Sequence, residues 1–376
     1  MKLTIKKEIL LDALNKVSKA ISTKNLIPVL AGIKFELKKN KLTLTASDND
    51  ITIQTTIESD NDEDFKVEDE GNIIVQGKYI LDIVRKLPDK YINIEVIDEL
   101  KILIYTENSE FNLNGINESE YPSINLEESK KKIDINSSIF KDLVNQTAFA
   151  ASNEETKPVL TGINFNIVGD TLECNSTDSY RLARKIIKLD KVSEDNYNIV
   201  IPSHNIVEFS RIMDDDPDSK VEIHIFNNKI LFKYKNVLFQ SRLINGTYPN
   251  TANLMPESSY MIITANLNDF YSVIDRASIL TSDKEKNIVT LETDGNTLIL
   301  KSSSIEIGRV EEKMKITKNV EDDIKISFSA RYMMEALKSF STETVEIHYV
   351  GEIKPIILKS SEEETLTQLV LPIRTY

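Results

Sequence analysis

The sequence is poor in the residues that build disulfides, thiolate metal clusters and nucleotide-binding loops. It has one cysteine, Cys174, which excludes an intrachain disulfide and a cysteine-rich metal site. Cys174 falls in a predicted strand, so we expect it to be inert. The ten glycines form neither a dinucleotide-binding fingerprint nor a P-loop, and no nucleophile elbow occurs. The common nucleotide-binding and serine-hydrolase sites are therefore excluded.

Long apolar runs are also missing. No stretch approaches the ~20 apolar residues that are needed to span a bilayer. Residues 1–8 lack the continuous apolar segment of a signal peptide. The single cysteine fits a reducing compartment. We therefore expect a cytoplasmic protein.

Histidine is scarce, and His204, His224 and His348 share no metal-ligand spacing. His224 and His348 fall in predicted strands, where a lone histidine more often has a structural role. The acidic triplet at 214–216 could imitate a metal cluster, but it follows a predicted helix as a loop. We expect no metal, no cofactor and no catalytic residue.

The net charge is −14. By itself this argues against nonspecific binding to nucleic acid, because phosphate contacts rely on Lys and Arg. Net charge is a sum, however, and binding depends on where the charges lie. Part of the acidic surplus forms runs between periodic segments, at 60–64, 68–70 and 214–216. We expect these runs to be solvated loops.

An internal repeat organises the sequence. Residues 157–165, KPVLTGINF, repeat residues 27–35, IPVLAGIKF, at an offset of 130 positions. The match extends upstream to Leu3 and downstream to Ile57 without a gap, which marks a duplication. The second copy continues into residues 177–183, TDSYRLA, which the first copy lacks.

Hydrophobic periodicity predicts one module six times: a strand, an amphipathic helix and three further strands. Helical stripes occur at 9–21, 80–87, 139–147, 206–213, 267–274 and 333–340. Two modules make a unit of about 125 residues, near the usual domain size. We therefore expect three α+β domains at 1–127, 128–253 and 254–376, each with two helices packed on antiparallel sheets. Such an array leaves open strand edges at its ends, and pairing with a second copy would close a ring.

The order of these features resembles one known family. The Pro-Val-Leu-x-Gly repeat, residues 177–183, Tyr248-Pro249 and the final Leu371-Pro372-Ile373-Arg374 look like those of the beta subunits of bacterial DNA polymerase III, the sliding clamps. The resemblance covers the whole chain. It implies a head-to-tail homodimeric ring around duplex DNA, with helices lining the hole and sheets forming the outer wall. It also implies a protein without chemistry of its own, which tethers the polymerase and is opened by an ATP-driven loader.

The resemblance implies three sets of site residues. Positions that match sequence-independent DNA contacts are Lys24, Lys78, Lys157 and His204. Other positions match a cleft for short peptides of the polymerase alpha subunit, the clamp loader, other polymerases and mismatch-repair proteins. These are Leu160, Thr177, Tyr180, Arg181, Leu182, Pro249, Leu254, Tyr332, Ile353, Pro355, Leu369, Leu371, Pro372, Ile373 and Arg374. Positions at the dimer interface are Phe111, Leu113, Ile279 and Leu280. A basic lining inside an acidic exterior would reconcile DNA binding with the net charge.

Three positions depart from the family pattern. Ser329 stands where Asn is frequent, His204 where Lys can occur, and the chain continues past Arg374 as Thr375-Tyr376. Two other functions stay open. A tandem-repeat adaptor that never touches DNA would have no basic stripe on its helices. An enzyme with a site between units would need convergent titratable residues. The sequence also does not separate a replicative clamp from a specialised paralogue.

Overall fold

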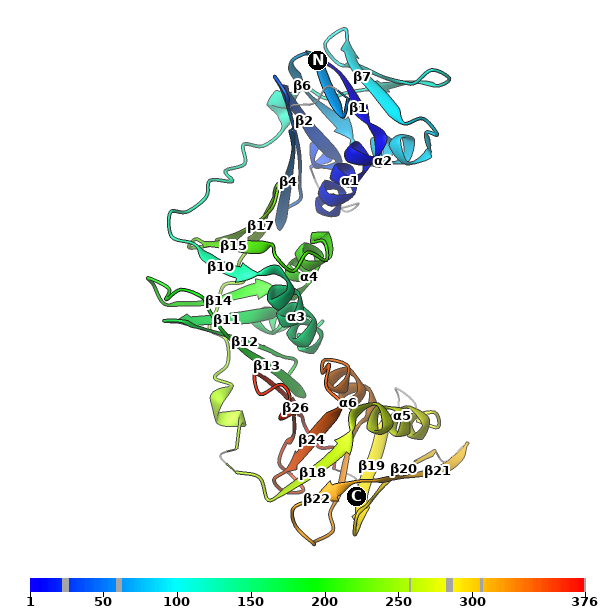
Figure 1. Ribbon diagram of the computed structural model, residues 1–376, viewed down its shortest axis with the longest axis vertical. Coiled ribbons are helices and arrows are strands. Elements are labelled where there is room, and N and C mark those ends of the chain that lie inside the picture. The colour runs from blue at the N-terminus through cyan, green and yellow to red at the C-terminus, as the bar shows by residue number, and fades with distance from the viewer. Residues whose placement is uncertain (22–26, 59–62, 257, 282–286, 305–306, 375–376) are drawn as a thin grey trace. The chain divides into compact units, whose positions relative to one another are not determined.

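The computed structural model describes residues 1–21, 27–58, 63–256, 258–281, 287–304 and 307–374 (Figure 1). The chain divides into two compact units. Unit 1 comprises Met1–Phe140 and Glu208–Leu243, and unit 2 comprises Lys141–Val207 and Ile244–Tyr376. The strands pair in antiparallel fashion, which confirms the expected α+β class.

Six α-helices occur in the described residues, as the periodicity predicted. They are α1 (Lys7–Val17), α2 (Gly77–Lys86), α3 (Ser137–Thr147), α4 (Ser203–Ile212), α5 (Leu267–Ser278) and α6 (Ala330–Leu337). Short 3₁₀ helices are η1 (Ser18–Ala20), η2 (Pro28–Ala31), η3 (Glu118–Glu120), η4 (Ala148–Ala150), η5 (Pro158–Thr161) and η6 (Ala252–Leu254). The first stripe runs past α1 because η1 continues it as a tighter final turn. None of the helices in these described ranges is long and apolar enough to cross a membrane.

Unit 1 holds two sheets. The five-stranded sheet has the order β5-β1-β7-β8-β9. Its strands are β1 (Lys2–Lys6), β5 (Phe65–Asp69), β7 (Tyr91–Ile97), β8 (Lys101–Tyr105) and β9 (Glu110–Asn114). The eight-stranded sheet has the order β10-β15-β16-β17-β4-β3-β2-β6. Its strands are β2 (Gly32–Lys38), β3 (Lys41–Ser47), β4 (Ile51–Glu58), β6 (Gly71–Gln76), β10 (Ile133–Asn136), β15 (Lys220–Ile225), β16 (Lys229–Tyr234) and β17 (Val237–Arg242).

The larger sheet of unit 1 is continuous across two repeats. β4 belongs to the first repeat and β17 to the second, and they pair in register with Ile53 opposite Phe239. Each of these strands would otherwise be an open edge, and pairing them satisfies both rows of backbone groups. α1 packs beside α2 and against β3 and β4 (Figure 1).

Four phenylalanines form the centre of the second-repeat part of unit 1. Phe140 from α3 and Phe209 from α4 meet Phe232 and Phe239 of the sheet, and all four side chains are fully buried. The Phe209 and Phe232 rings stack at 4.8 Å, and Phe140 meets both edge-on at 5.5 Å. Such pairs add to the stabilisation from apolar burial. They hold the helices on the sheet through ring geometry.

One expectation about the acidic runs is wrong. Residues 68–69 do not lie in a loop but end β5, which pairs with β1. Phe65 is buried at the start of this strand, while Glu68 is exposed with a carboxylate oxygen 3.3 Å from Lys2 Nζ. Burial of Phe65 and cross-strand pairing outweigh the low β propensity of the acidic residues. The run at 214–216 is a loop after α4, as expected, and residues 60–62 lie outside the described part.

Unit 2 also holds two sheets. The nine-stranded sheet has the order β14-β11-β12-β13-β26-β25-β24-β18-β22, and the four-stranded sheet the order β21-β20-β19-β23. The strands are β11 (Gly162–Val168), β12 (Thr171–Thr177), β13 (Arg181–Lys188), β14 (Tyr197–Pro202), β18 (Met261–Asn266), β19 (Ile288–Asp294), β20 (Thr297–Ser304), β21 (Gly308–Lys315), β22 (Thr317–Lys318), β23 (Lys325–Ser329), β24 (Thr344–Tyr349), β25 (Ile356–Lys359) and β26 (Leu366–Val370). α5 packs beside α6 and over β20 and β21 (Figure 1). Cys174 lies buried in β12, as expected.

The repeated Pro-Val-Leu-x-Gly ends in a glycine for a steric reason. A Cβ on Gly162, at the start of β11, would lie 2.5 Å from Val200 Cγ1 and 2.7 Å from the Ile201 carbonyl oxygen of β14. A Cβ on Gly32, at the start of β2, would lie 2.4 Å from Ile74 Cγ2 of β6. The neighbouring strand therefore approaches closely at both copies of the motif, and only glycine leaves room.

Candidate functional site

A groove in unit 2 lies where a turn of the second repeat meets the end of the chain. Its volume is about 640 Å³. It is lined by Tyr180, Asn287, Ser329, Arg331, Tyr332, Leu371, Pro372, Ile373 and Arg374. Six of these residues were predicted for the peptide cleft. Apolar walls with a few polar groups are the usual composition of a ligand groove.

Strand pairing explains why residues so distant in sequence meet here. β13 pairs with β26, which places Arg181 opposite Val370 and Leu182 opposite Leu369. The following residues continue this contact, because the Leu371 amide donates to the Tyr180 carbonyl at 2.9 Å. The Ile373 amide donates to the Ser327 carbonyl at 2.7 Å. The last described residues are thus fixed along one side of the groove.

The turn that carries Tyr180 is held by Asp178. Its Oδ1 accepts from the Tyr180 amide at 2.9 Å and from the Arg181 amide at 3.1 Å. Asp48 does the same for residues 50 and 51 in the first repeat, at 2.7 Å each. An aspartate that accepts from the backbone two residues on is a common way to fix a tight turn. The duplication therefore preserves the turn, and the second copy adds Tyr180 and Arg181.

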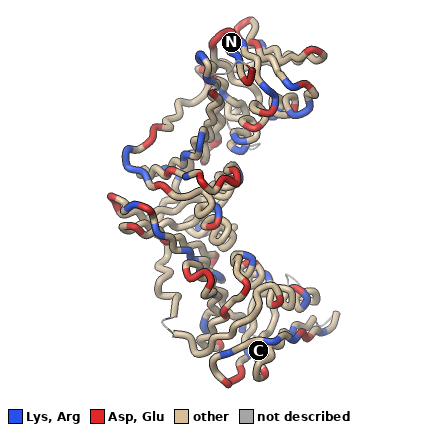
Figure 2. Tube along the Cα trace, viewed as in Figure 1, with Lys and Arg blue, Asp and Glu red and all other residues tan. Residues whose placement is uncertain are grey.

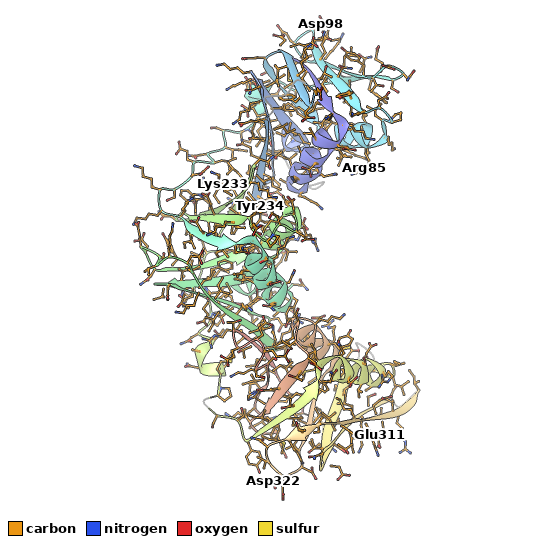
Figure 3. All side chains as sticks on the ribbon, in the orientation of Figure 1. Arg85, Asp98, Lys233, Tyr234, Glu311 and Asp322 are labelled. Atoms are coloured by element: carbon orange, nitrogen blue, oxygen red, sulfur yellow. The ribbon has the colours of Figure 1, made fainter. Side chains whose placement is uncertain are left out.

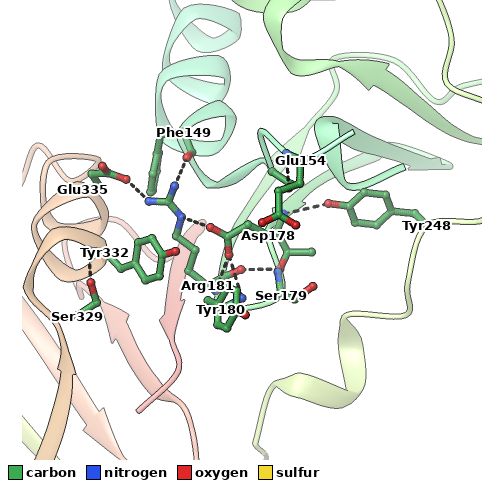
Figure 4. Close-up of polar contacts among 12 residues, drawn as sticks. Phe149, Glu154, Asp178, Ser179, Tyr180, Arg181, Tyr248, Ser329, Tyr332 and Glu335 are labelled. Carbon is green, nitrogen blue, oxygen red and sulfur yellow. Dashed lines mark hydrogen bonds and ion pairs between the residues drawn. The ribbon is translucent and has the colours of Figure 1, made fainter. Parts of the chain in front are cut away.

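Arg181 joins this turn to η4 and α6 (Figure 4). Its Nε donates to Asp178 Oδ2 at 3.0 Å, and its Nη2 donates to the Phe149 carbonyl at 2.7 Å. Its Nη1 forms an ion pair with Glu335 of α6. The guanidinium carbon also lies 4.6 Å from the centre of the Tyr332 ring. Arg181 is only 9% exposed, so its hydrogen-bonding capacity is taken up largely inside unit 2.

Two tyrosines form one wall of the groove. The rings of Tyr180 and Tyr332 stack with centroids 6.4 Å apart and planes inclined by 21°. Tyr180 is 60% exposed, while Tyr332 rests on the Arg181 guanidinium. Ser329 begins α6 as its N-cap, with its Oγ accepting from the Tyr332 amide at 3.5 Å (Figure 4). The serine that departs from the family pattern is therefore engaged in helix capping.

Some of the predicted cleft residues lie beneath the groove instead of lining it. Leu182 and Leu369 pack with Ile357 in one buried cluster, next to which Leu371 lies. Leu160 packs with Val200 and Tyr248 in another.

Tyr248 connects the second cluster to the turn, because the Thr177 amide donates to Tyr248 Oη at 3.0 Å. Burial raises the pKa of the Tyr248 hydroxyl above its ordinary value, and the hydrogen bond from the Thr177 amide offsets part of that rise. The phenol therefore stays neutral at physiological pH.

Among the described residues, four others that were predicted for the cleft do not line this groove. Pro249, Leu254 and Ile353 are exposed, and Pro355 is half-buried. Sequence reasoning also missed residues that shape the site. Phe149, Glu335 and Asn287 come from three separate elements or loops, and no local pattern links them to residues 177–183.

The predicted DNA-contacting residues lie in both units. Lys78 is exposed on α2 of unit 1, and Lys157 and His204 are exposed in unit 2, at the start of η5 and on α4. Within the part of the chain that the structure describes, none of the three forms an ion pair. Lys24 lies outside the described residues. Figure 2 shows that basic and acidic positions are interspersed along the trace of both units.

Several other helix cations are matched by nearby acids. In unit 1, Lys16 lies 2.7 Å from Asp12 of the same helix, and Glu208 lies between Lys19 at 3.8 Å and Arg211 at 2.5 Å. In unit 2, Arg276 lies 2.8 Å from Glu312. These pairs neutralise part of the positive charge on the helices.

The predicted dimer residues lie on or beside the outermost strands of two sheets. Phe111 is 38% exposed on β9, and Leu113 of the same strand is half-buried. Ile279 follows α5 and is 73% exposed, and Leu280 beside it is half-buried. Among the described residues β9 pairs only with β8, and β21 pairs only with β20.

Comparison with known proteins agrees along the whole chain. Models of the three domains of the DNA polymerase III beta subunit match in order: the N-terminal domain at 1–126, the central domain at 134–250 and the C-terminal domain at 252–374. The beta sliding clamp of Staphylococcus epidermidis is 38% identical over 378 residues, covering 100% of both chains.

Solved structures give the same result. The DNA polymerase sliding clamp from Bacillus subtilis has a TM-score of 0.96 and 38% identity, with 100% of both chains covered. The DNA polymerase III beta chain from Streptococcus pneumoniae has a TM-score of 0.94 and 32% identity over 100% of both chains. The resemblance is confirmed, and this chain belongs to the DNA polymerase III beta subunit family, the bacterial sliding clamps, which are non-catalytic processivity factors.

Proposed function

We propose that two copies of this chain close head to tail into a ring around duplex DNA and keep the replicative polymerase on its template. The observation that carries this proposal is the uninterrupted match of three consecutive clamp domains over the full chain. We place this function in the cytoplasm, where a bacterial chromosome is replicated. We also propose three domains with borders at 1–127, 128–253 and 254–376.

Ring closure is supported by two open strand edges. β9 ends the five-stranded sheet of unit 1 and β21 ends the four-stranded sheet of unit 2. An open edge presents a row of unpaired amide and carbonyl groups, which another strand can satisfy. Contact between β9 of one copy and β21 of the next is heterologous, and two such contacts close a dimer. Phe111 and Leu113 with Ile279 and Leu280 supply the apolar part of this interface.

DNA binding is supported by the exposed Lys78 and Lys157 rather than by a strongly basic surface. Lys24, Lys78, Lys157 and His204 are the proposed phosphate contacts, and contacts of this kind carry no sequence information. Because many other helix cations are matched by acids, we expect weak, salt-sensitive binding to an open duplex. Retention on DNA then depends on topology, since a closed ring cannot leave a circle.

The test compares circular with linear DNA. The clamp is loaded by its loader and ATP on a nicked circle, and bound clamp is separated from free clamp in high salt. We expect the clamp to stay on the circle and to leave after the DNA is linearised. If the clamp left both forms of DNA at the same rate, encirclement would be excluded, and an adaptor that does not surround DNA would be favoured. Mass determination should give twice the chain mass of 42.8 kDa.

The proposed DNA contacts have a separate test. Lys24→Glu combined with Lys78→Glu should slow loading several-fold while leaving the dimer intact, because it reverses charge beside the duplex. Lys191→Glu reverses an exposed charge in a loop and serves as the matched control. A double variant that loads at the unchanged rate would contradict the lining role of these lysines.

Partner docking is supported by the groove beside β26. Two or three apolar side chains of a short peptide could bury themselves against Tyr180, Leu371 and Ile373, each adding roughly 1.5–3 kcal/mol. The expected partners are the polymerase alpha subunit, the clamp loader, other polymerases and mismatch-repair proteins. The Thr375-Tyr376 ending lies outside the described residues.

The docking test uses overlapping fluorescent peptides that span the polymerase alpha subunit. A peptide that binds the unaltered clamp should lose at least tenfold in affinity when Tyr180→Ala or deletion of residues 371–376 is introduced. Tyr260→Ala removes another exposed tyrosine of unit 2 and should have no effect. Full affinity in both groove variants would exclude this groove as the docking site.

A further inference from the structure

A buried histidine in unit 1 has a ring nitrogen without a partner. His224, on β15, is 1% exposed, and no described residue hydrogen-bonds to its Nε2. Its Nδ1 lies 3.0 Å from the Ser129 carbonyl oxygen. A carbonyl only accepts, so Nδ1 carries the proton and the Nε2 lone pair is left available. Buried polar atoms of this kind are uncommon and call for an explanation.

Two carboxylates lie next to this lone pair. Glu222 is two residues earlier on β15 and shares the same face, because alternate strand residues point the same way. Its Oε2 lies 3.8 Å from His224 Nε2. Glu128 comes from the segment before β10, and one ligand atom from each of the three residues lies within 4.8 Å of the other two. All three belong to unit 1.

The separation of His224 and Glu222 is close to that of two ligands in a metal coordination sphere. Nitrogen and oxygen ligands lie about 2.0–2.2 Å from Zn²⁺, so two ligands of a tetrahedral site are roughly 3.4 Å apart. The observed 3.8 Å between the imidazole nitrogen and the carboxylate oxygen closes with a small side-chain movement. The hydrogen bond from Nδ1 to a backbone carbonyl is the usual support of a metal-bound histidine. Imidazole favours Zn²⁺ and related ions over Mg²⁺ or Ca²⁺.

We propose that His224, Glu222 and Glu128 form a binding site for a divalent transition-metal ion, with Zn²⁺ the best chemical match. Three protein ligands leave the fourth tetrahedral position for water. This site is independent of ring closure and of the peptide groove.

Two lysines compete with the metal for the carboxylates. Lys132 Nζ lies 2.8 Å from Glu222 Oε2, and Lys233 Nζ lies 2.9 Å from both oxygens of Glu128 (Lys233 is marked in Figure 3). Lys132 also lies 3.6 Å from Asp134. Asp134 can therefore stay paired with the Lys132 ammonium when the metal binds Glu222.

A metal here would fasten the segment between the first two repeats to the sheet. That segment already follows β15 and β16, since Lys229 Nζ donates to the Asn125 carbonyl at 2.6 Å and His224 meets Ser129. Coordination by Glu128 adds a link of the same kind. The role is structural, because the ligands join two segments of unit 1.

The experiment uses the full chain without an affinity tag. Zn²⁺ is titrated calorimetrically after chelator treatment, and Co²⁺ is added in parallel to record the visible absorption of a tetrahedral site. We expect one ion per chain and a rise in Tm with Zn²⁺. His224→Ala and Glu222→Gln should each reduce affinity at least tenfold. Glu222→Gln changes a half-buried residue, so it tests the site even if His224→Ala fails to fold.

Two controls separate a metal site from an ordinary ion-pair cluster. His348→Ala removes a histidine whose Nε2 lies 3.1 Å from Glu346 and whose Nδ1 lies 2.9 Å from Ser259 Oγ, and it should keep full Zn²⁺ affinity. Lys132→Gln removes a competing ammonium and should tighten Zn²⁺ binding several-fold. The proposal is overturned if the folded protein binds no stoichiometric Zn²⁺. Equal affinity in Glu222→Gln and the unaltered chain would overturn it as well.

Discussion

The guanidinium of Arg181 joins β13 to η4 and α6. Its three donor nitrogens meet Asp178, Glu335 and the Phe149 carbonyl, and its flat face supports the Tyr332 ring. An arginine so engaged acts on the groove through Tyr332, because it sets the position of the aromatic wall. Its planar fork of donors fits this role, and a lysine could not replace it.

Replacing Arg181 with methionine should lower the free energy of unfolding by about 2–4 kcal/mol, because Asp178 and Glu335 lose their charged partner inside unit 2. Chemical denaturation monitored by circular dichroism measures the change. Arg184→Met, three residues farther along β13, breaks the half-buried Arg184–Glu173 pair and should cost about 1 kcal/mol or less. Equal losses in the two variants would contradict the central role of Arg181.

The Glu173–Arg184 pair on β12 and β13 also predicts a pH dependence. Burial alone would raise the pKa of Glu173, but hydrogen bonds from Arg184 and Asn175 hold it below its ordinary value of 4.5. A carboxylate with a lowered pKa stabilises the folded state above the unfolded pKa, and this contribution is lost as pH falls through the folded value.

The unaltered chain should therefore be more stable than Glu173→Gln at pH 7, by about 0.5–1 kcal/mol. The difference should shrink as pH falls below the ordinary carboxylate range. Thermal melts between pH 7 and pH 3 measure it, with Glu155→Gln, an exposed turn residue, as the control. A difference that does not change with pH would show that Glu173 contributes through packing alone.

The duplication is visible in the secondary structure at the first residues of β2 and β11. Each begins at the glycine of the repeated motif, and each lies against a neighbouring strand of its own unit, β6 or β14. The two positions differ in what surrounds them. At Gly162 a backbone carbonyl lies 2.7 Å from an added Cβ, whereas at Gly32 the closest atom is the Ile74 Cγ2 methyl and the backbone oxygens are 3.2 Å or farther.

Gly162→Ala should therefore destabilise unit 2 by about 1–3 kcal/mol, because β14 has to move away from β11. Gly32→Ala should cost less, since the nearest backbone oxygen there is 3.2 Å from the added Cβ and not 2.7 Å. Hydrogen exchange of the β11 and β14 amides, together with unfolding curves, checks both variants. A larger loss for Gly32→Ala would mean that the contact with the buried Ile74 side chain costs more than the contact with the Ile201 carbonyl at Gly162.

At the scale of the whole molecule, each unit has, among its described residues, a sheet whose last strand has an unpaired edge, β9 in unit 1 and β21 in unit 2. β9 carries the exposed Phe111 and the half-buried Leu113, and the exposed Ile279 follows α5, which packs over β21; this arrangement favours association with a second copy. Pairing at these edges would satisfy backbone groups and bury apolar surface in the same step.

Phe111→Glu or Ile279→Glu should weaken the dimer at least tenfold without unfolding the monomer, because both side chains are exposed in the single chain. Analytical ultracentrifugation over a concentration series measures the dissociation constant. Val192→Glu, at another exposed apolar side chain, should leave it unchanged. A dimer of undiminished strength in both interface variants would place the interface elsewhere.

The sequence by itself determined the helices, most strands, the duplication and the family. Those features depend on periodicity within about 20 residues or on matches between parts of the chain, and both can be recognised in the sequence alone. Tertiary structure alone decided which repeats share a sheet, as where β4 pairs with β17 and β13 with β26. It also decided that Arg181 is held by Glu335, and that Glu128 lies beside His224. These partners are far apart in sequence, and only the pairing of distant strand edges brings them together.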